Sequence, residues 1–206
     1  MYKLPYFTEA DHEKVIAFMK ENAFALVTGF GKEYPVATQL PLNIEIREGN
    51  KIFVTGHLMK NTDHHKAFEK NENVLVVFTG PHCYVSASWY TNPTSASTWN
   101  YITVHAKGKI KFTDAEGTYK AIQNITNKYE GKSTAAAFDK LPEAYVQKLV
   151  TAIVGFEIEV TCLENVFKLS QNHDVETRKN IATELNQRED DDSKIIAREI
   201  LSRLTN

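Results

Sequence analysis

The sequence is poor in cysteine. Its two cysteines, Cys83 and Cys162, lie far apart in 206 residues and form no CxxC pair. They are too sparse for a disulfide framework or a dithiol redox site, so we expect two free thiols. No apolar run approaches the length that spans a bilayer, and the first residues, MYKLPYFTEADHEK, lack the zones of a secretory signal. These absences predict a soluble, cytoplasmic protein with no membrane partner.

The chain also lacks an excess of charge of either sign. With 24 basic and 26 acidic residues, its formal net charge is −2 at pH 7. Nothing global therefore attracts nucleic acid or an anionic membrane. Any recognition of phosphate has to be local. At 42% hydrophobic residues, the chain is long enough to bury a sizeable core.

The motifs of several common enzyme classes are missing. There is no GxGxxG fingerprint of a dinucleotide site and no GxSxG of a serine hydrolase. Gly131-Lys132-Ser133 resembles the end of a phosphate-binding loop, but Thr126 stands where the earlier glycine is required. No two of the seven histidines show HxxxH spacing. We therefore assign no catalytic and no metal-ligating residue, and leave open whether the protein is an enzyme.

What the chain does have is a concentration of aromatic residues between Val74 and Lys111, which includes both tryptophans. Val74 to Phe78 is an apolar run rich in β-branched residues and predicts a strand buried on both faces. Gly80-Pro81 is a dipeptide typical of turns, so we expect the chain to turn there.

From Trp99 to Lys111 the residues alternate with a period of two. One side of the predicted strand is mostly apolar and faces the core. The other side, here called the polar-aromatic face, carries Trp99, Tyr101, Thr103, His105, Lys107, Lys109 and Lys111. This face suits a flat, hydrogen-bonding, negatively charged ligand. It equally suits a solvated sheet face or a dimer contact, because rings and lysine stems cover apolar surface without any ligand.

The remaining patterns predict an ordered series of helices and strands. Thr8 with Asp11 resembles a capping box for a helix from Glu9 to Glu21. Val36 to Arg47 alternates as a strand, bent or at an edge because Pro41 has no N–H. We expect further strands at 23–28, 51–57 and 153–160, and a hairpin turn at 48–50. Helices are expected at 63–71, 114–129, 143–150, 174–187 and 191–204, and four of them are expected to be capped, by Asp63, Asp114, Asp174 and Asp191.

The loop from His57 to Thr62 precedes the helix that Asp63 is expected to cap. Free backbone N–H groups and the helix dipole favour an anion at such a point, and Lys60 adds a positive charge. The sequence thus indicates a candidate anion site in this loop.

The residues from Asp174 to the end predict a pair of helices with eight acidic and six basic side chains. A terminal helix pair is compatible with DNA binding, but this charge gives phosphate contacts no help. We favour packing or dimerisation as its role.

Four segments carry a family resemblance: GHLMK, GPHCYVSASWY, STWNYITVHAKGK and KLSQN, in this order. Together they make the chain similar to the FMN-binding negative transcriptional regulator family, often called PaiB-like. The resemblance implies a mostly β fold with flanking helices (α+β), an FMN-binding split β-barrel, working as a homodimer with FMN near the subunit interface. We expect a barrel domain at 1–165 and a C-terminal helical appendage at 166–206, packed on the barrel or on the dimer partner.

The resemblance also carries residues over to this chain. Its histidine and following basic residue fall on His57 and Lys60, where the family more often has arginine. The other matching positions are Tyr84, Ser86, Trp89, Tyr90, Thr98, Trp99, Asn100, Tyr101, Val104, His105, Lys168, Leu169, Ser170, Gln171 and Asn172.

FMN presents a phosphate and a planar ring with polar edges. The phosphate needs cationic or N–H partners. Lys60 with its helix N-terminus is the first choice, followed by Lys107 and Lys168. The ring needs apolar contacts and donors, for which Trp89, Trp99 and Tyr84 with Ser86, Asn100 and Gln171 are suitable. Backbone groups can come from Thr38, Gln39, Leu40 and Pro41.

Two functions follow from the resemblance. The first is an FMN-binding homodimeric regulator of transcription. The second is an FMN-dependent oxidoreductase, of the flavin reductase or pyridoxamine oxidase type, with only an indirect regulatory effect. The sequence shows no basic recognition helix, which weakens the case for direct DNA binding. It shows no obvious general acid or base beyond His57 and His105, which weakens the case for a specific enzymatic reaction.

Overall fold

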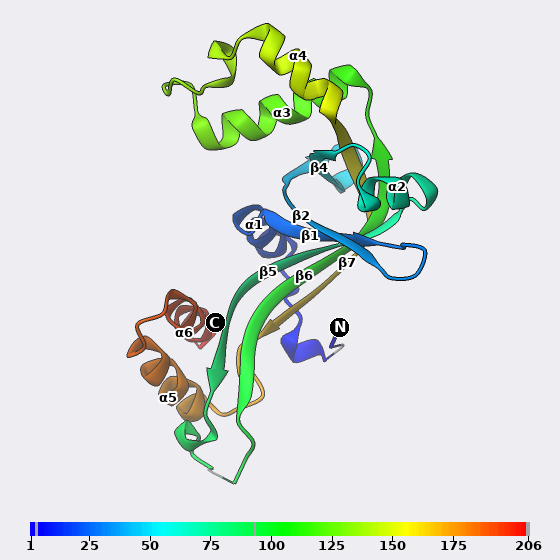
Figure 1. Cartoon of the computed structure of the whole chain (residues 1–206). Helices are drawn as coiled ribbons and strands as arrows, with labels where there is room; N and C mark the ends of the chain where they lie inside the picture. Colours follow the sequence, from blue (N-terminus) through cyan, green and yellow to red (C-terminus); the bar gives the residue numbers. More distant parts are fainter. Residues whose placement is uncertain (3, 93, 205–206) are drawn as a thin grey trace. The chain divides into compact units, whose positions relative to one another are not determined.

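The computed structural model describes residues 1–2, 4–92 and 94–204 (Figure 1). Its strands form one seven-stranded sheet with the order β2-β1-β5-β6-β7-β4-β3. The register of the pairs β1–β2, β1–β5, β3–β4 and β4–β7 is antiparallel. The strands are β1 (Phe24–Gly29), β2 (Val36–Pro41), β3 (Asn43–Arg47), β4 (Lys51–Met59), β5 (Asn73–Val85), β6 (Thr98–Phe112) and β7 (Ile153–Lys168).

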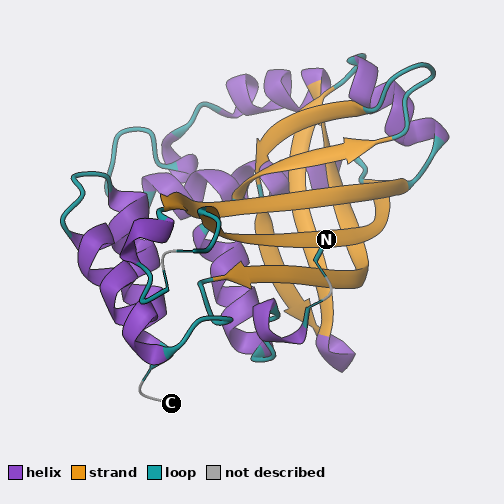
Figure 2. Ribbon diagram, turned by 90° about the horizontal axis from the view of Figure 1, so that it is seen from below, coloured by secondary structure: helices purple, strands orange, loops and turns teal. Residues whose placement is uncertain are grey.

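Helices occur before, between and after the strands in the chain order; Figure 2 draws the helices in purple and the strands in orange. Within the described residues, none of them combines the length and apolarity needed to span a membrane. The α-helices are α1 (His12–Glu21), α2 (Asp63–Lys70), α3 (Ala115–Glu130), α4 (Glu143–Ala152), α5 (Val175–Asn186) and α6 (Asp191–Ser202). The short 3-10 helices are η1 (Pro5–Phe7), η2 (Glu48–Asn50), η3 (Ala87–Trp89) and η4 (Phe138–Lys140).

The chain divides into two compact units. Unit 1 consists of Met1–Phe18, Thr79–Val104 and Glu164–Asn206, and unit 2 of Met19–Phe78 and His105–Leu163. The long strands β5, β6 and β7 each contribute residues to both units. The expected division into a barrel at 1–165 and an appendage at 166–206 stays a prediction.

In unit 2, the strand predicted from Val36 to Arg47 is interrupted at Leu42. The interruption follows Pro41, whose missing N–H cannot extend the ladder. The resulting strands β2 and β3 are the two ends of the sheet order. Leu42 is fully buried and its N–H donates to the carbonyl of Ala23, 2.8 Å away. The prediction of a bent or edge strand at Pro41 is confirmed.

Strand β6 has the two faces that its sequence predicts. Asn100, Ile102, Val104, Ala106 and Ile110 are buried, together with Gly108. The residues between them are exposed or half-buried. The polar-aromatic face is therefore a true strand face.

The turn predicted at Gly80-Pro81 is wrong, because β5 runs through both residues. The pairing of β5 with β1 is confined to Val74–Val77. Pro81 lies beyond that ladder, where a missing N–H on that side costs no β1 hydrogen bond. Gly80 is tolerated in the strand for a different reason. A Cβ at this position would lie 2.4 Å from the ring of Phe18. Close packing selects this glycine.

Helix starts confirm some predicted caps and correct others. Asp114 and Asp174 accept hydrogen bonds from Gly117 N and Thr177 N, as expected. At α6 the capping residue is Asp190 and not Asp191. At α1, Asp11 accepts from the N–H groups of residues 13 and 14, so the helix starts at His12 and not at Glu9. The last strand, β7, extends to Lys168, well past its predicted end at Val160.

The expected Asp63 cap of α2 is also wrong. Thr62 is the capping residue, and its hydroxyl accepts from His65 N at 3.3 Å and donates to Met59 O at 3.0 Å. Asp63 occupies the first helical position, where its carboxylate accepts from His64 N and its pKa is lowered by that bond. A side-chain anion therefore already sits at this helix N-terminus.

We expect Thr62→Ala to lower the free energy of unfolding by about 1 kcal/mol, since two hydrogen bonds of the helix start are lost. Chemical denaturation measures this loss. Asp63→Ala is the matched control and is expected to cost less. Equal losses in the two variants would contradict Thr62 as the cap.

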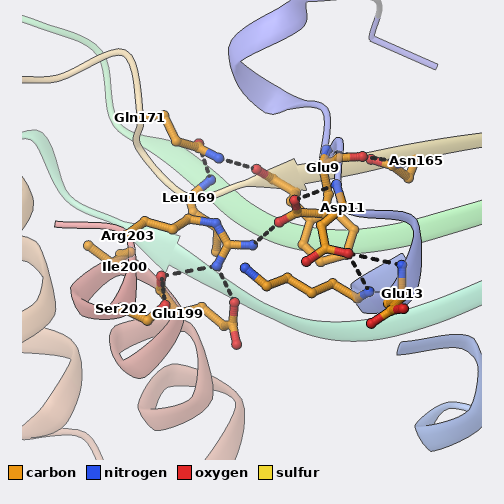
Figure 3. A network of polar contacts seen from close by, with 12 residues as sticks. Glu9, Asp11, Glu13, Asn165, Leu169, Gln171, Glu199, Ile200, Ser202 and Arg203 are labelled. Atoms are coloured by element: carbon orange, nitrogen blue, oxygen red, sulfur yellow. Dashed lines mark hydrogen bonds and ion pairs between the residues drawn. The ribbon is translucent and has the colours of Figure 1, made fainter. Parts of the chain in front are cut away.

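A polar network in unit 1 ties the N-terminal segment to α6 and β7 (Figure 3). The guanidinium of Arg203 donates to a Glu9 carboxylate oxygen at 2.7 Å and also pairs with Glu199. Glu9 N donates to Asn165 Oδ1 at 2.8 Å, and Asn165 Nδ2 donates back to Glu9 O at 3.1 Å. This network fixes the segment that leads into α1.

Candidate functional site

Unit 1 contains a cavity of about 480 Å³. This volume is in the range of small-molecule sites. The cavity lies where the first residues, the loop before β6, the start of β6 and the end of β7 meet. Its walls are formed by Tyr2, Tyr6, Phe7, Tyr90, Ser95, Ala96, Ser97, Thr98, Asn100, Lys168, Ser170, Asn172 and His173. Six positions that match the family motifs are thereby brought together: Tyr90, Thr98, Asn100, Lys168, Ser170 and Asn172.

Lys168 is the cation of this cavity. Its ammonium donates to the Thr98 hydroxyl and lies 6.0 Å from the ring centres of Tyr2 and Phe7. Burial lowers the pKa of Lys168 from its ordinary value. Among the described residues, no carboxylate pairs with it. A half-buried cation without a counter-charge favours an anion beside it.

Asn100 and Ser170 form a buried polar pair at the base of the cavity. Asn100 Nδ2 donates to Ser170 Oγ at 2.9 Å, and Ser170 Oγ donates to Asn100 Oδ1 at 3.3 Å. Ser170 has a φ of 63°, a left-handed conformation that a non-glycine residue rarely adopts. This pair holds the turn after β7 against β6.

Gln171 is used within its own turn. Its Nε2 donates to Phe167 O, and its Oε1 accepts from Leu169 N at 2.7 Å. Both ends of the amide are therefore engaged by backbone, as Figure 3 shows for the Leu169 contact. The structure gives Gln171 a role in shaping the turn that presents Lys168 and Ser170.

Ser86 and Trp89 lie at the η3 turn after β5. Ser86 Oγ caps this turn by accepting from Ser88 N at 3.3 Å. The half-buried Trp89 ring lies under the guanidinium of Arg188, 5.0 Å from the ring centre, and Arg188 also donates to Tyr84 O at 2.9 Å. A cation–π contact thus already occupies one side of this indole.

Tyr84 and Trp99 form an exposed aromatic pair. Their ring centres are 6.1 Å apart in an edge-to-face arrangement, and the ring of His82 lies 6.1 Å from Trp99. The exposed fractions are 43% for Tyr84 and 54% for Trp99. These rings can contact a flat ligand or a second subunit.

In unit 2, His57 and His105 lie on β4 and β6. His57 Nδ1 is buried without a hydrogen-bond partner among the described residues, and burial lowers the pKa of this imidazole. Burial therefore favours the uncharged form of the His57 imidazole. His105 is half-buried.

Lys60, the first choice for the phosphate, has protein partners in unit 2. Its N–H donates to Ala152 O at 3.0 Å, and its ammonium donates to Thr151 O at 3.3 Å and Val150 O at 3.5 Å. These carbonyls end α4, where the helix dipole is negative and a cation is stabilising. Lys60 therefore caps a helix C-terminus.

Thr38, Gln39, Leu40 and Pro41 lie on β2, the first strand of the sheet order. Their register pairs them with β1 only. On its other side, β2 has no neighbouring strand in that order. The backbone groups on that side are therefore not used by the sheet, and a ligand could contact them.

The sequence interpretation missed the rings that line the cavity from the N-terminal segment: Tyr2, Tyr6 and Phe7. It also missed His173, whose ring lies 4.4 Å from that of the buried Tyr90. The Tyr90 hydroxyl has no hydrogen-bond partner within the described part of the chain, and burial raises its pKa. The aromatic content of MYKLPYF was the one available signal.

These residues fit a phosphorylated flavin. The cavity supplies an uncompensated ammonium, hydroxyl and amide donors, and ring surface, which are the groups that a phosphate with a polar chain and a planar ring needs. The residues described form no cluster of three His, Cys, Asp or Glu side chains suited to a metal ion.

Comparisons with known proteins agree with this chemistry. Residues 1–162 match the model of the family described as "Putative FMN-binding domain". The chain is 32% identical over 198 residues to "Protease synthase and sporulation protein PAI 2" of Bacillus subtilis, covering 96% of this chain and 95% of that protein.

Solved structures share the fold at low sequence identity. The flavocytochrome Anf3 of Azotobacter vinelandii has a TM-score of 0.62 and 15% identity, covering 81% of this chain and 72% of that one. The FAD and heme binding protein of Mycobacterium smegmatis has a TM-score of 0.59 and 13% identity, covering 78% and 73%. The predicted α+β, split β-barrel fold class is confirmed. Since the family model covers most of the chain and the Bacillus relative nearly all of it, the chain belongs to the FMN-binding, PaiB-like family, and FMN is its cofactor.

Proposed function

We propose that this protein is a cytoplasmic, FMN-binding homodimer that acts as a negative regulator of transcription. The observation that carries the proposal is the relative from Bacillus subtilis, "Protease synthase and sporulation protein PAI 2", which aligns over 96% of this chain.

The residues proposed to hold FMN are those predicted from the sequence. Those that lie in unit 1 are Tyr84, Ser86, Trp89, Trp99, Asn100, Lys168, Ser170 and Gln171. Those that lie in unit 2 are Thr38, Gln39, Leu40, Pro41, His57, Lys60 and His105. When bound, FMN supplies one- and two-electron redox chemistry. The chain's own groups bind and orient it, and the exposed Tyr84–Trp99 pair is the surface we assign to the second subunit.

The regulatory effect is proposed to need no direct DNA contact. The helix pair α5–α6 would be the natural reader of DNA, but α6 is capped by Asp190 and begins with Asp191 and Asp192. A recognition helix approaches DNA with its N-terminal residues, and three carboxylates there repel phosphate. The buried faces of α5 and α6 hold apolar residues such as Ile181, Leu185 and Ile196, which supports a packing role.

The alternative is an FMN-dependent oxidoreductase with an indirect effect on expression. It is supported by the redox character of two fold neighbours, one a flavocytochrome and the other a FAD and heme binding protein. The neutral imidazole of His57 is the group in unit 2 best suited to accept a proton in such a reaction.

The test combines three measurements on the purified full chain. Sedimentation with and without FMN is expected to give a dimer. A gel shift with promoter DNA at physiological salt is expected to give no complex, whereas a salt-sensitive, sequence-specific shift would overturn the absence of DNA contact. Transcript profiles of a strain lacking the gene are expected to show derepressed genes, restored by the wild-type chain. Restoration that requires NADH or NADPH oxidation by the protein would favour the oxidoreductase.

A further inference from the structure

We propose that the unit 1 cavity is the site of a second ligand, a small carboxylic acid that carries an aromatic ring, and that Lys168 pairs with its carboxylate while FMN stays bound. The proposal rests on the proposed FMN-binding function and names the class of small molecule to which such a protein responds. It assigns the ammonium of Lys168 to the acid, and the flavin keeps the other residues proposed for it.

The position of the cavity in the chain is the first argument. The residues that line it all belong to unit 1. The match to the FMN-binding family model ends at residue 162, whereas Lys168, Ser170, Asn172 and His173 follow that end. The lysine of the cavity therefore lies outside the segment that matches the domain model, and its charge can serve a molecule other than the shared cofactor.

The charge of the cavity is the second argument. Among the described residues that line it, Lys168 is the one lysine or arginine, and none is acidic. Its ammonium donates to the neutral hydroxyl of Thr98. A carboxylate carries one negative charge and would neutralise this ammonium. A phosphate monoester, with a charge near −2, would leave negative charge unpaired in a half-buried place. The single cation therefore fits a monocarboxylate.

The rings on the cavity wall are the third argument. The ring centres of Tyr2 and Phe7 lie 6.0 Å from the Lys168 ammonium. Tyr90 and His173 form a second pair of rings, with their centres 4.4 Å apart. Aromatic side chains pack on a flat ligand through offset or edge-to-face contacts. An acid with an aromatic ring can thus pack its ring on the wall while its carboxylate meets the ammonium.

Neutral hydrogen-bond donors in the cavity are the fourth argument. Ser97, Thr98 and Asn172 line it and carry hydroxyl and amide groups. Tyr90 also lines it, is 6% exposed, and its hydroxyl has no hydrogen-bond partner among the described residues. A buried hydroxyl without a partner is costly, and an acceptor oxygen of a ligand would relieve that cost. The cavity therefore favours a ligand with acceptor oxygens.

The test compares three probes on the full chain saturated with FMN. Hydrocinnamate has the ring and the carboxylate, hydrocinnamamide replaces the carboxylate by a neutral amide, and propionate lacks the ring. By isothermal titration calorimetry, we expect hydrocinnamate to bind about ten- to a hundredfold more tightly than its amide, as for one charge-assisted hydrogen bond. Propionate is expected to bind more weakly than hydrocinnamate, because it has no ring to pack.

Three variants, each saturated with FMN, locate the acid in the cavity. Lys168→Met is expected to lose the preference for hydrocinnamate over its amide. Lys168→Arg keeps the charge and is expected to retain most of that preference. Lys194→Met is the matched control, because Lys194 belongs to unit 1, donates to Glu189 O and is not among the described residues that line the cavity. It is expected to keep the wild-type preference.

The wild type decides the matter even if Lys168→Met does not fold. Wild-type crystals soaked with hydrocinnamate are expected to show its carboxylate beside Lys168, and a carboxylate bound elsewhere would overturn the proposal. So would equal binding of acid and amide by the wild type, or an acid preference that survives Lys168→Met. Displacement of FMN by hydrocinnamate would also overturn it, while leaving FMN binding and the proposed function intact. Failure of the wild type to bind FMN would instead overturn the proposed function.

Discussion

Replacing Gly108 by alanine is expected to lower the free energy of unfolding by about 3 kcal/mol or more, at the upper end of overpacking costs. Gly108 lies on β6 within unit 2, and a Cβ there would stand 2.4 Å from the carbonyl oxygen of Glu159 and 2.7 Å from Ile158 Cγ2. The nearest atom belongs to the backbone of β7 and cannot turn away as a side chain can. Relief would require the two strands to separate.

Gly80 provides a matched comparison, because its added Cβ would also stand 2.4 Å from the nearest atom. That atom is at the far end of the Phe18 ring, a side chain that can shift at the expense of its edge-to-face contact with Phe167. We expect Gly80→Ala to cost about 1–2 kcal/mol. Adding Phe18→Leu should recover part of that loss. Urea denaturation of both variants checks the ranking, and a larger loss at Gly80 than at Gly108 would contradict it.

The second large effect is expected at Arg203. Arg203→Met should lower the free energy of unfolding by about 2–3 kcal/mol, because it leaves the Glu9 carboxylate without its partner in a mostly buried place. The side chains of Arg203 and Glu9 are 19% and 13% exposed. The guanidinium also lies 5.6 Å from the ring centre of Phe167, so packing is lost with the charge.

Two controls separate the ion pair from general effects of the substitution. Combining Arg203→Met with Glu9→Gln should cost less than the sum of the two single changes, since the unpaired charge is gone. Lys120→Met removes an exposed pair with Glu116 on α3 and is expected to leave stability unchanged within error. If the Arg203 variant behaves like the Lys120 variant, the network in Figure 3 is not a stabilising one.

Local periodicity was enough to predict parts of the fold. The two faces of β6, the edge position at Pro41 and the starts of α3 and α5 followed from alternation, the missing N–H of proline and capping residues. These features depend on neighbours within a few positions. The family motifs then supplied the split-barrel fold, because they cover much of the chain.

What the sequence did not reveal depends on contacts between residues that are distant in sequence. Gly80-Pro81 has the composition of a turn, yet β5 continues because Phe18 packs on the glycine and the β1 ladder ends before the proline. Lys60 has the charge for a phosphate, but the sequence does not reveal that α4 ends beside it. The cavity at Lys168 is lined by the rings of Tyr2, Tyr6 and Phe7, more than 150 positions away in the sequence. No pattern near Lys168 predicts this contact.

The junction at Leu42 has a consequence for association between chains. The outermost strands of a sheet offer unpaired backbone groups, through which proteins aggregate or exchange segments. Here the two outermost strands are consecutive, and Pro41 removes one donor where they meet. A foreign strand that pairs with β2 would meet no N–H at Pro41, beside the buried Leu42, whose own N–H is bonded to the Ala23 carbonyl. Resistance to fibril formation would then depend on this corner, and a cut or insertion there should make the protein prone to it.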